Sequence, residues 1–333
     1  KLHKSLITPQ FNTRNVLTNS IWEFVTLWLK RNGKKKALFY WNQAKEFADA
    51  SSSLPIESAP LLHYYSFMNA VKSLLESKGI TYDEMHGIKA HNIRGNSSKI
   101  TLSNEGVKIL NKGILPAFST YLRDQDQNCI HSLEDLLYNI PCIHRSFCLT
   151  YKSHSDLFIP LKDCIYLFDE NTRKVIFSAK IGSDFVNINL SKRVPNIFNY
   201  NQNESKITSK DSFLISDNGK LSQPELFLLC ALNNKIRNHI CYINGSTTLW
   251  YLKLSIGGKK NINRSPMTLM MAAMHRLSEI CRYKPIELSA FLDGQKNWLL
   301  NEFINMSPSQ FYDEIASEIT GHQFYLPNVR GTT

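Results

Sequence analysis

Apolar residues recur at three- and four-residue steps through residues 60–77, which is the spacing of one face of an α-helix. The side chains on that face are Leu61, Tyr64, Tyr65, Met68, Val71 and Leu75. Pro60 suits the first helical turn, where its missing N–H costs nothing, and Gly79 suits the left-handed residue that follows a helix. The pattern predicts a packed central helix. A ligand site lined by His63, Tyr64 and Asn69 is the alternative interpretation of its polar positions.

Other helices are expected toward both ends of the chain. Four of them start with a Ser followed by Pro or by an acid in the first turn, which is the signature of a capped helix, and residues 20–30 and 41–50 are expected as two helices joined by a basic turn. The expected helices span residues 20–30, 41–50, 222–238 and 265–283, with a last one from Ser307 to Gly321 and a short one after Ser132 that ends before Pro141.

The middle of the chain carries strand signals. Residues 164–168 and 174–179 are β-branched and aromatic runs that flank a polar turn, which predicts a hairpin. A second hairpin is expected between residues 99–102 and 107–110. Residues 195–220 are rich in Asn, Ser and Lys, which predicts a long loop and an internal boundary.

These elements predict an α+β fold that is predominantly helical. In it the N- and C-terminal helices pack together, with a small antiparallel β region between them. The expected regions are an N-terminal helical region (1–97), a mixed region with β-hairpins (98–215) and a C-terminal helical bundle (216–333). We expect the two helical regions to share one core.

Composition sets the expected compartment. The 333 residues include no run of eighteen apolar positions, and the first residues lack the apolar block of a signal peptide, so we expect no membrane partner. Seven cysteines without a repeated framework are typical of reduced thiols. A cytoplasmic location is expected.

The net charge of +11 is unevenly distributed. Residues 1–50 hold nine Lys or Arg against three acids, and much of this charge lies in Lys30, Arg31, Lys34, Lys35 and Lys36. A second basic stretch contains Lys259 and Lys260. Such turns attract phosphate backbones through counterion release, so nucleic acid is a possible partner. A solvated connection between helices is the alternative.

A second sequence block of note lies near the C-terminus. Met274–Pro285 carries Leu277, Ser278, Arg282, Tyr283 and Pro285 in the pattern Leu-Ser-x-x-x-Arg-Tyr-x-Pro. Together with the residue 59–75 run and Met85–Lys89, this block resembles the YaaC-like protein family over roughly residues 20–320. The resemblance implies a bacterial protein and supplies no reaction. The family's Trp three residues after the proline is Leu288 here, which argues against a site that depends on that Trp.

The strongest candidate for a site combines both blocks. We expect His86 and Arg282 to converge, with Tyr64 and Tyr283 framing them, because they are the ionisable and hydroxyl-bearing positions of the two blocks. The alternative is a structural network in which Arg282 donates to carbonyls at a helix end.

Searches for catalytic patterns yield little. The chain has no G-x-S-x-G, no Walker A and no G-x-G-x-x-G motif, and no Arg precedes a His at the four-to-six-residue spacing of helical ribonucleases. A zinc site is an alternative for the Cys-x-His pairs at 129–131 and 142–144 with Cys148 and His154, although their spacing is unlike that of a zinc knuckle. No metal or other cofactor is expected, and whether the chain is an enzyme stays open.

The sequence therefore predicts a non-enzymatic interaction or regulatory protein of YaaC-like type that acts through a protein partner. A nucleic-acid-binding protein, or an unrecognised nuclease that uses the basic loops, is the alternative. The sequence leaves the oligomeric state undetermined.

Overall fold

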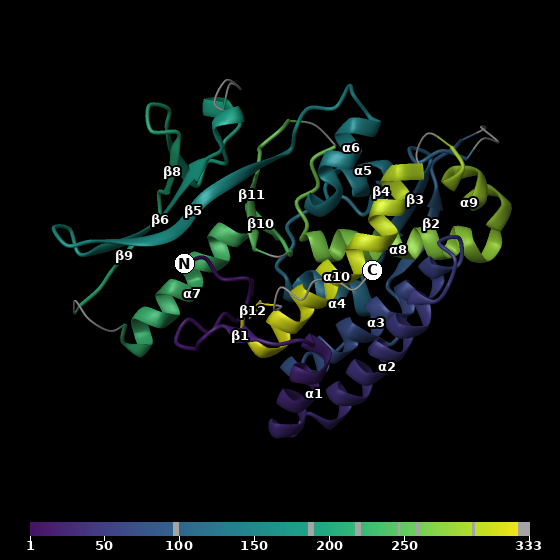
Figure 1. Ribbon diagram of the computed structural model, residues 1–333, viewed down its shortest axis with the longest axis horizontal. Coiled ribbons are helices and arrows are strands. Elements are labelled where there is room, and N and C mark those ends of the chain that lie inside the picture. Colours follow the sequence, from purple (N-terminus) through teal and green to yellow (C-terminus); the bar gives the residue numbers. More distant parts are fainter. Residues whose placement is uncertain are drawn as a thin grey trace. The chain divides into compact units, whose positions relative to one another are not determined.

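The protein, shown as a computed structural model in Figure 1, divides into two compact units. The structure describes residues 1–95, 100–185, 190–216, 221–245, 247–257, 260–294 and 297–325. The sheet unit comprises Lys1–Leu17, Asp156–Gly258 and Gly321–Thr333, and the helical unit comprises Thr18–Ser155 and Lys259–Thr320. Each unit is therefore assembled from separate stretches of the chain.

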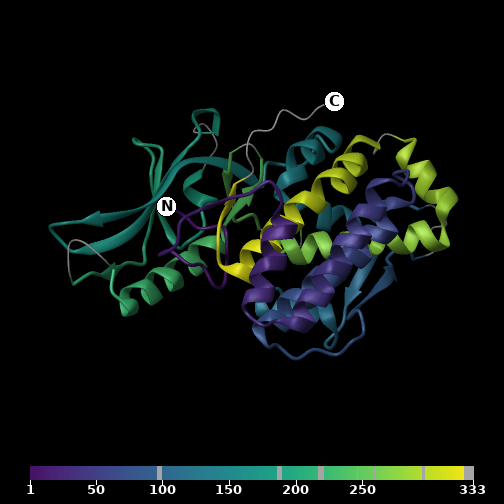
Figure 2. The same cartoon turned by 60° about the horizontal axis from the view of Figure 1, so that its bottom comes forward.

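The helical unit is built around one long helix, α3. Its helices are α1 (Ile21–Arg31), α2 (Lys35–Ser52), α3 (Ala59–Lys78), α4 (Ile114–Tyr121), α5 (Leu133–Tyr138), α6 (His144–Thr150), α8 (Pro266–Tyr283), α9 (Pro285–Leu292) and α10 (Asn297–Thr320), with a 3-10 turn at Pro141–Ile143. Helix α3 packs against α2, α8 and α10, and Figures 1 and 2 show α2 and α3 running side by side. The predicted helix over residues 60–77 is confirmed.

Small residues let neighbouring helices approach α3 closely. Ser66 Oγ donates to the Ala44 carbonyl of α2 at 2.6 Å, and Ser73 Oγ donates to the Ala37 carbonyl at 2.8 Å. Tyr312 of α10 donates to Ser66 Oγ at 2.6 Å. Because the polar groups of α3 are satisfied in this way, the helix is buried around most of its circumference.

Several helix starts follow the local signals. Ser132 Oγ accepts from the backbone N–H of Asp135 at the start of α5, and Ser265 Oγ accepts from Met267 at the start of α8. Gly79 ends α3 with φ +68°, as expected for a left-handed cap. The expected last helix is wrong at its start, because α10 begins at Asn297 and holds Pro308 inside it. Burial of Leu299, Leu300 and Phe303 outweighs the hydrogen bond that this proline removes.

A three-stranded antiparallel sheet belongs to the helical unit. Its strands are β2 (Ile88–Asn92), β3 (Glu105–Ile109) and β4 (Ile130–Ser132), in the order β2-β3-β4. The expected hairpin between residues 99–102 and 107–110 is wrong. Thr101 accepts from the backbone of Asn104 and Glu105, so this segment forms a tight turn before β3, and β3 pairs with β2 and β4. Lys99 lies outside the described residues.

The sheet unit contains a seven-stranded antiparallel sheet in the order β10-β11-β5-β6-β8-β7, with β9 beside β6 (Figure 1). The strands are β5 (Phe158–Asp169), β6 (Lys174–Ile181), β7 (Phe198–Asn201), β8 (Lys206–Ser209), β9 (Phe213–Leu214), β10 (Ile240–Ile243) and β11 (Leu249–Lys253). The unit also contains helix α7 (Gln223–Arg237), two 3-10 turns (Ser183–Phe185 and Leu190–Lys192) and the parallel pair β1 (Val16–Leu17) and β12 (Phe324–Tyr325).

This sheet corrects the predicted fold class. A small β region between packed terminal helices is wrong, because the sheet has seven strands, a core of its own and the first residues of the chain in its unit. The expected loop over residues 195–220 instead holds β7, β8 and β9. Its buried Phe198, Ile207 and Phe213 alternate with the polar residues that suggested a loop.

The predicted hairpin of residues 164–168 and 174–179 is confirmed by the pairing of β5 with β6. The predicted region boundaries at residues 97 and 215 stay a prediction. The two compact units divide the chain at other positions, after residues 17, 155, 258 and 320. Among the described residues, no helix combines the length and the apolar character needed to cross a membrane.

Candidate functional site

The two sequence blocks meet in the helical unit, where α3 packs against α8. Tyr64 of α3 is 1 % exposed, and its hydroxyl lies 2.9 Å from Nδ1 of His86, at hydrogen-bonding distance. The Tyr64 ring also contacts the ring of His275 on α8, at 4.9 Å between centroids. Sequence reasoning did not single out His275, which falls among the apolar residues of its helix.

Burial sets the protonation of this cluster. Desolvation lowers the pKa of His275 to about 3, helped by nearby His86 and Arg282, and desolvation also lowers the pKa of His86. Burial raises the pKa of Tyr64. At neutral pH the cluster therefore holds two neutral imidazoles and a protonated phenol. Nδ1 of His275 has no hydrogen-bond partner among the described residues.

Arg282 continues the cluster toward solvent. Its guanidinium donates to the Tyr65 hydroxyl at 3.4 Å and to the Tyr283 hydroxyl at 3.3 Å. It also lies 5.3 Å from the centre of the Tyr283 ring, within reach of a cation–π contact. Among the described residues, Arg282 therefore donates to tyrosine hydroxyls and not to carbonyls at the end of a helix. Tyr64 is buried, whereas Tyr283 is 65 % exposed.

His63 and Asn69 serve contacts within the helices. His63 Nδ1 lies 3.0 Å from Ser51 Oγ of α2, and desolvation lowers its pKa to about 4. Asn69 Nδ2 donates to the Tyr65 carbonyl of its own helix at 2.9 Å. Among the described residues, the hydrogen bonds of these two side chains go to Ser51 and Tyr65 and not to the Tyr64–His86–His275 cluster.

The predicted basic positions lie on the helical unit, at the turn between α1 and α2. Lys30 and Arg31 end α1, and Lys34, Lys35 and Lys36 begin α2. Lys36 Nζ forms an ion pair with Glu76 at 2.7 Å. Lys260 Nζ lies 2.9 Å from His154 Nε2, and Lys259 lies outside the described residues.

A pocket that sequence reasoning missed opens between the end of β2 and the last turns of α8. It has a volume of about 230 Å³ and is lined by Ala90, Asn92, Arg94, Arg276, Glu279, Ile280, Tyr283 and Lys284. Glu105 of β3 is fully buried and forms ion pairs with Arg94, at 2.8 Å, and with Arg276. We call these residues the cationic pocket. Its four α8 side chains recur at helical spacing from residue 276 to residue 283, and Lys284 follows the helix end, a signal that was present in the sequence.

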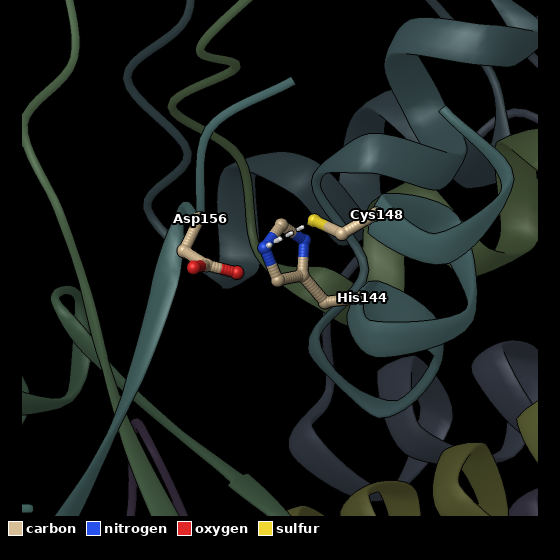
Figure 3. Close-up of side chains that lie close together, drawn as sticks. All are labelled: His144, Cys148 and Asp156. Atoms are coloured by element: carbon tan, nitrogen blue, oxygen red, sulfur yellow. Dashed lines mark hydrogen bonds between the residues drawn. The ribbon is translucent and has the colours of Figure 1, made fainter. Parts of the chain in front are cut away.

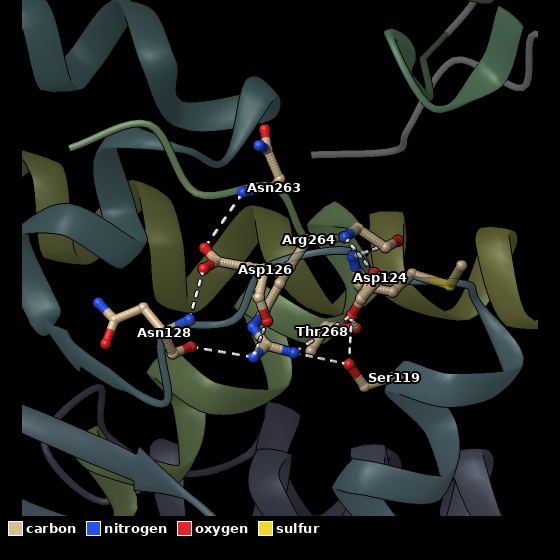
Figure 4. Close-up of polar contacts among 9 residues, drawn as sticks. Ser119, Asp124, Asp126, Asn128, Asn263, Arg264 and Thr268 are labelled. Carbon is tan, nitrogen blue, oxygen red and sulfur yellow. Dashed lines mark hydrogen bonds and ion pairs between the residues drawn. The ribbon is translucent and has the colours of Figure 1, made fainter. Parts of the chain in front are cut away.

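A second arginine–carboxylate cluster is wholly structural in its contacts (Figure 4). Arg264 donates to Ser119 Oγ at 2.8 Å and to the carbonyls of Asp126 and Asn128 at 3.0 Å. Asp124 accepts from the Ser265 backbone at 2.7 Å and from Thr268 at 2.8 Å. Burial raises the pKa of Asp124, although these hydrogen bonds oppose the shift. The cluster fastens the start of α8 to the segment after α4.

Of the residues weighed for zinc, His144 and Cys148 lie together on α6. Their Nε2 and Sγ atoms are 3.4 Å apart (Figure 3). Asp156, which Figure 3 also draws, belongs to the sheet unit. Among the described residues, no group of three metal-ligating side chains lies within one unit.

Comparison with known proteins gives one relationship. No curated protein and no solved structure matches the chain. The family model described as YaaC-like Protein matches residues 8–319, which includes the Tyr64 and Arg282 segments that meet between α3 and α8. The chain therefore belongs to the YaaC-like protein family.

Proposed function

We propose that this chain is a non-enzymatic interaction protein that acts through a partner protein, and that the partner docks at the junction of α8 and α9. The observation that carries the proposal is the exposure of Tyr283 and Ile286, at 65 % and 81 %. They lie five and eight residues after the run 267–278, each residue of which is buried. A partner that covered these large exposed side chains would remove their apolar surface from water, which favours binding.

The chemistry of this surface favours a protein segment with acidic and apolar residues. Arg282 lies beside Tyr283 with an exposed guanidinium, and Lys284 follows it. Tyrosine and arginine are the residue types that contribute most to protein–protein affinity. Glu279 acts on Arg282 and Glu287 on Lys284, but Arg282 is the exposed charge beside Tyr283, so the surface favours acidic groups on the partner.

The test is a capture experiment followed by a titration. The tagged full chain is expressed in its native cells, bound proteins are identified, and the main one is purified and titrated against variants. Tyr283→Ala and Ile286→Ser should each raise the Kd about tenfold, since central interface residues contribute more than 1 kcal/mol. Phe39→Ala is the matched control, because Phe39 is equally exposed, at 62 %, on α2. Equal affinity for wild type and both docking variants would contradict the proposal.

Nucleic-acid binding is the second candidate. Lys30, Arg31 and Lys35 are exposed, and among the described residues none of them forms an ion pair. This cationic turn would bind phosphate backbones with strong salt dependence. Changing Lys34, Lys35 and Lys36 together to Glu should abolish binding of duplex or single-stranded probes. Binding that is indifferent to this change, or to salt, would exclude the turn as a nucleic-acid site.

A further inference from the structure

The cationic pocket has more positive than negative charge on its wall. Arg94, Arg276 and Lys284 line it, and Glu279 is the one carboxylate among the lining residues. Glu105 lies behind the two arginines and is fully buried. Glu287 does not line the pocket but is close enough to Lys284 to oppose the lowering of its pKa. The lining itself carries three cations against Glu279 and so keeps a net positive charge in a partly desolvated place.

The arginines are held in place before any ligand arrives. Glu105 pairs with both of them, and Arg94 Nε also donates to Asn92 Oδ1 at 2.9 Å. Fixing the two guanidinium groups from behind leaves less conformational entropy to be lost on binding. The positive charge of the pocket is therefore already in place before a ligand binds.

Donors in this pocket remain unsatisfied. Arg276 is 5 % exposed, and its Nε has no hydrogen-bond partner among the described residues. The Lys284 side chain is half-buried, and no hydrogen bond or ion pair joins its Nζ to another described residue. Burial, together with the neighbouring Arg94 and Arg276, lowers the pKa of Lys284. A buried N–H without an acceptor costs free energy that an incoming oxygen would recover.

We propose that the cationic pocket is a binding site for a phosphoryl group, carried by inorganic phosphate or by a small phosphomonoester. A phosphoryl dianion matches three cations better than a carboxylate does, and its oxygens suit the fork of an arginine. The volume of about 230 Å³ is below the range of whole drug-sized ligands and suits a small anionic group. Tyr283 supplies an aromatic wall that an ester substituent would contact.

The experiment is calorimetric titration of the full chain with inorganic phosphate and with phenyl phosphate. Ionic strength is held constant with chloride, so that screening does not change between points. We expect saturable binding with one site per chain. If inorganic phosphate binds as tightly as phenyl phosphate, the ligand of the pocket is the free ion. If phenyl phosphate binds more tightly, the ligand is a phosphomonoester.

Variants link the binding to the pocket. Lys284→Gln should raise the Kd about tenfold, and Lys284→Arg should restore it, because a charge-assisted hydrogen bond is lost and regained. Glu279→Gln should tighten binding several-fold by removing the carboxylate of the wall. Lys89→Gln is the matched control, since Lys89 is exposed on β2 and alternation places it on the face opposite Ala90 and Asn92.

The absence of saturable binding to either probe would overturn the proposal. Equal affinity of wild type and Lys284→Gln, with unfolding midpoints that show both to be folded, would overturn it as well. Phosphate binding is measured without any partner protein. Its failure is therefore distinct from failure of the proposed docking surface.

Discussion

Two arginine–carboxylate clusters of the helical unit use the same chemistry in different ways. Around Arg264, the guanidinium donates to Ser119 and to two backbone carbonyls, and Asp124 accepts from three groups of its surroundings. Around Arg276, a buried Glu105 serves two arginines whose outer sides line an open pocket with Lys284.

The difference lies in the charge balance and in what the donors face. Arg264 lies beside Asp124 and Asp126, so acids outnumber cations, and both terminal nitrogens of its guanidinium donate to protein oxygens. In the lining of the cationic pocket Arg94, Arg276 and Lys284 stand against Glu279 alone, and these cations border an open volume of about 230 Å³. A closed arginine cluster fastens a helix, whereas an open one can receive an anion.

The largest expected effect follows from removing the buried acid of the open cluster. Glu105→Gln leaves Arg276 buried without its counter-charge, which should lower the free energy of unfolding by about 3–5 kcal/mol. Urea unfolding followed by circular dichroism measures this. A loss below about 1 kcal/mol would show that the pocket is not organised by Glu105.

Breaking the closed cluster should destabilise the chain by somewhat less. Arg264→Met removes several hydrogen bonds and leaves Asp124 with its three other donors, so we expect a loss of about 2–4 kcal/mol. Phosphate affinity, measured by calorimetry at a temperature where the variant is folded, should stay unchanged. A parallel loss of phosphate affinity would join the two clusters into one site.

The stability of the chain should fall in acid because of His275, the buried neutral histidine of the Tyr64–His86–His275 cluster. His275 has a pKa of about 3 when folded and about 6.5 when unfolded. The unfolded chain binds this proton more readily, so stability is complete above pH 6.5 and falls below it. The expected loss is about 1.4 kcal/mol per pH unit, or about 2 kcal/mol at pH 5.

His275→Asn supplies the control for this pH dependence. Other buried histidines, His63 and His86 among them, contribute slopes of their own. The measure is therefore the difference in slope between variant and wild type, from urea unfolding at several pH values between 7 and 5. Identical slopes would mean that His275 titrates normally in the folded chain.

The smallest expected effect on stability belongs to Lys284. Its amine has no described partner, so Lys284→Gln should change the free energy of unfolding by less than about 0.5 kcal/mol. Thermal unfolding in phosphate-free buffer checks this. A large loss would place Lys284 with Arg264 among the structural cations.

Local sequence signals predicted the helices better than the sheet. Pro60, Gly79 and the caps at Ser132 and Ser265 act within a few residues of the chain, so the corresponding helices could be read directly. The seven-stranded sheet depends on pairings between strands far apart in sequence, such as β11 with β5 and β9 with β6. Short runs such as Leu249–Lys253 carry no sign of the distant strand that they pair with.

The part of the cationic pocket that lies on α8 was predictable from the sequence. The spacing of residues 276, 279 and 283 marks one face of α8, Lys284 follows the helix, and the second sequence block contains all four. Arg94 and Glu105 come from β2–β3, whose pairing was predicted incorrectly. His86 and Tyr64 were expected together and do form a contact, while His275 was hidden among apolar neighbours.

The most direct test of the contrast between open and closed clusters is the stabilisation that phosphate gives to each variant. A ligand that binds only the folded chain raises its unfolding midpoint. At constant ionic strength, phosphate should stabilise wild type and Arg264→Met equally, stabilise Glu279→Gln more, and lose most of its effect on Lys284→Gln. Equal stabilisation of all four proteins, or of none, would contradict the assignment of the Arg94–Arg276–Lys284 pocket as an anion site.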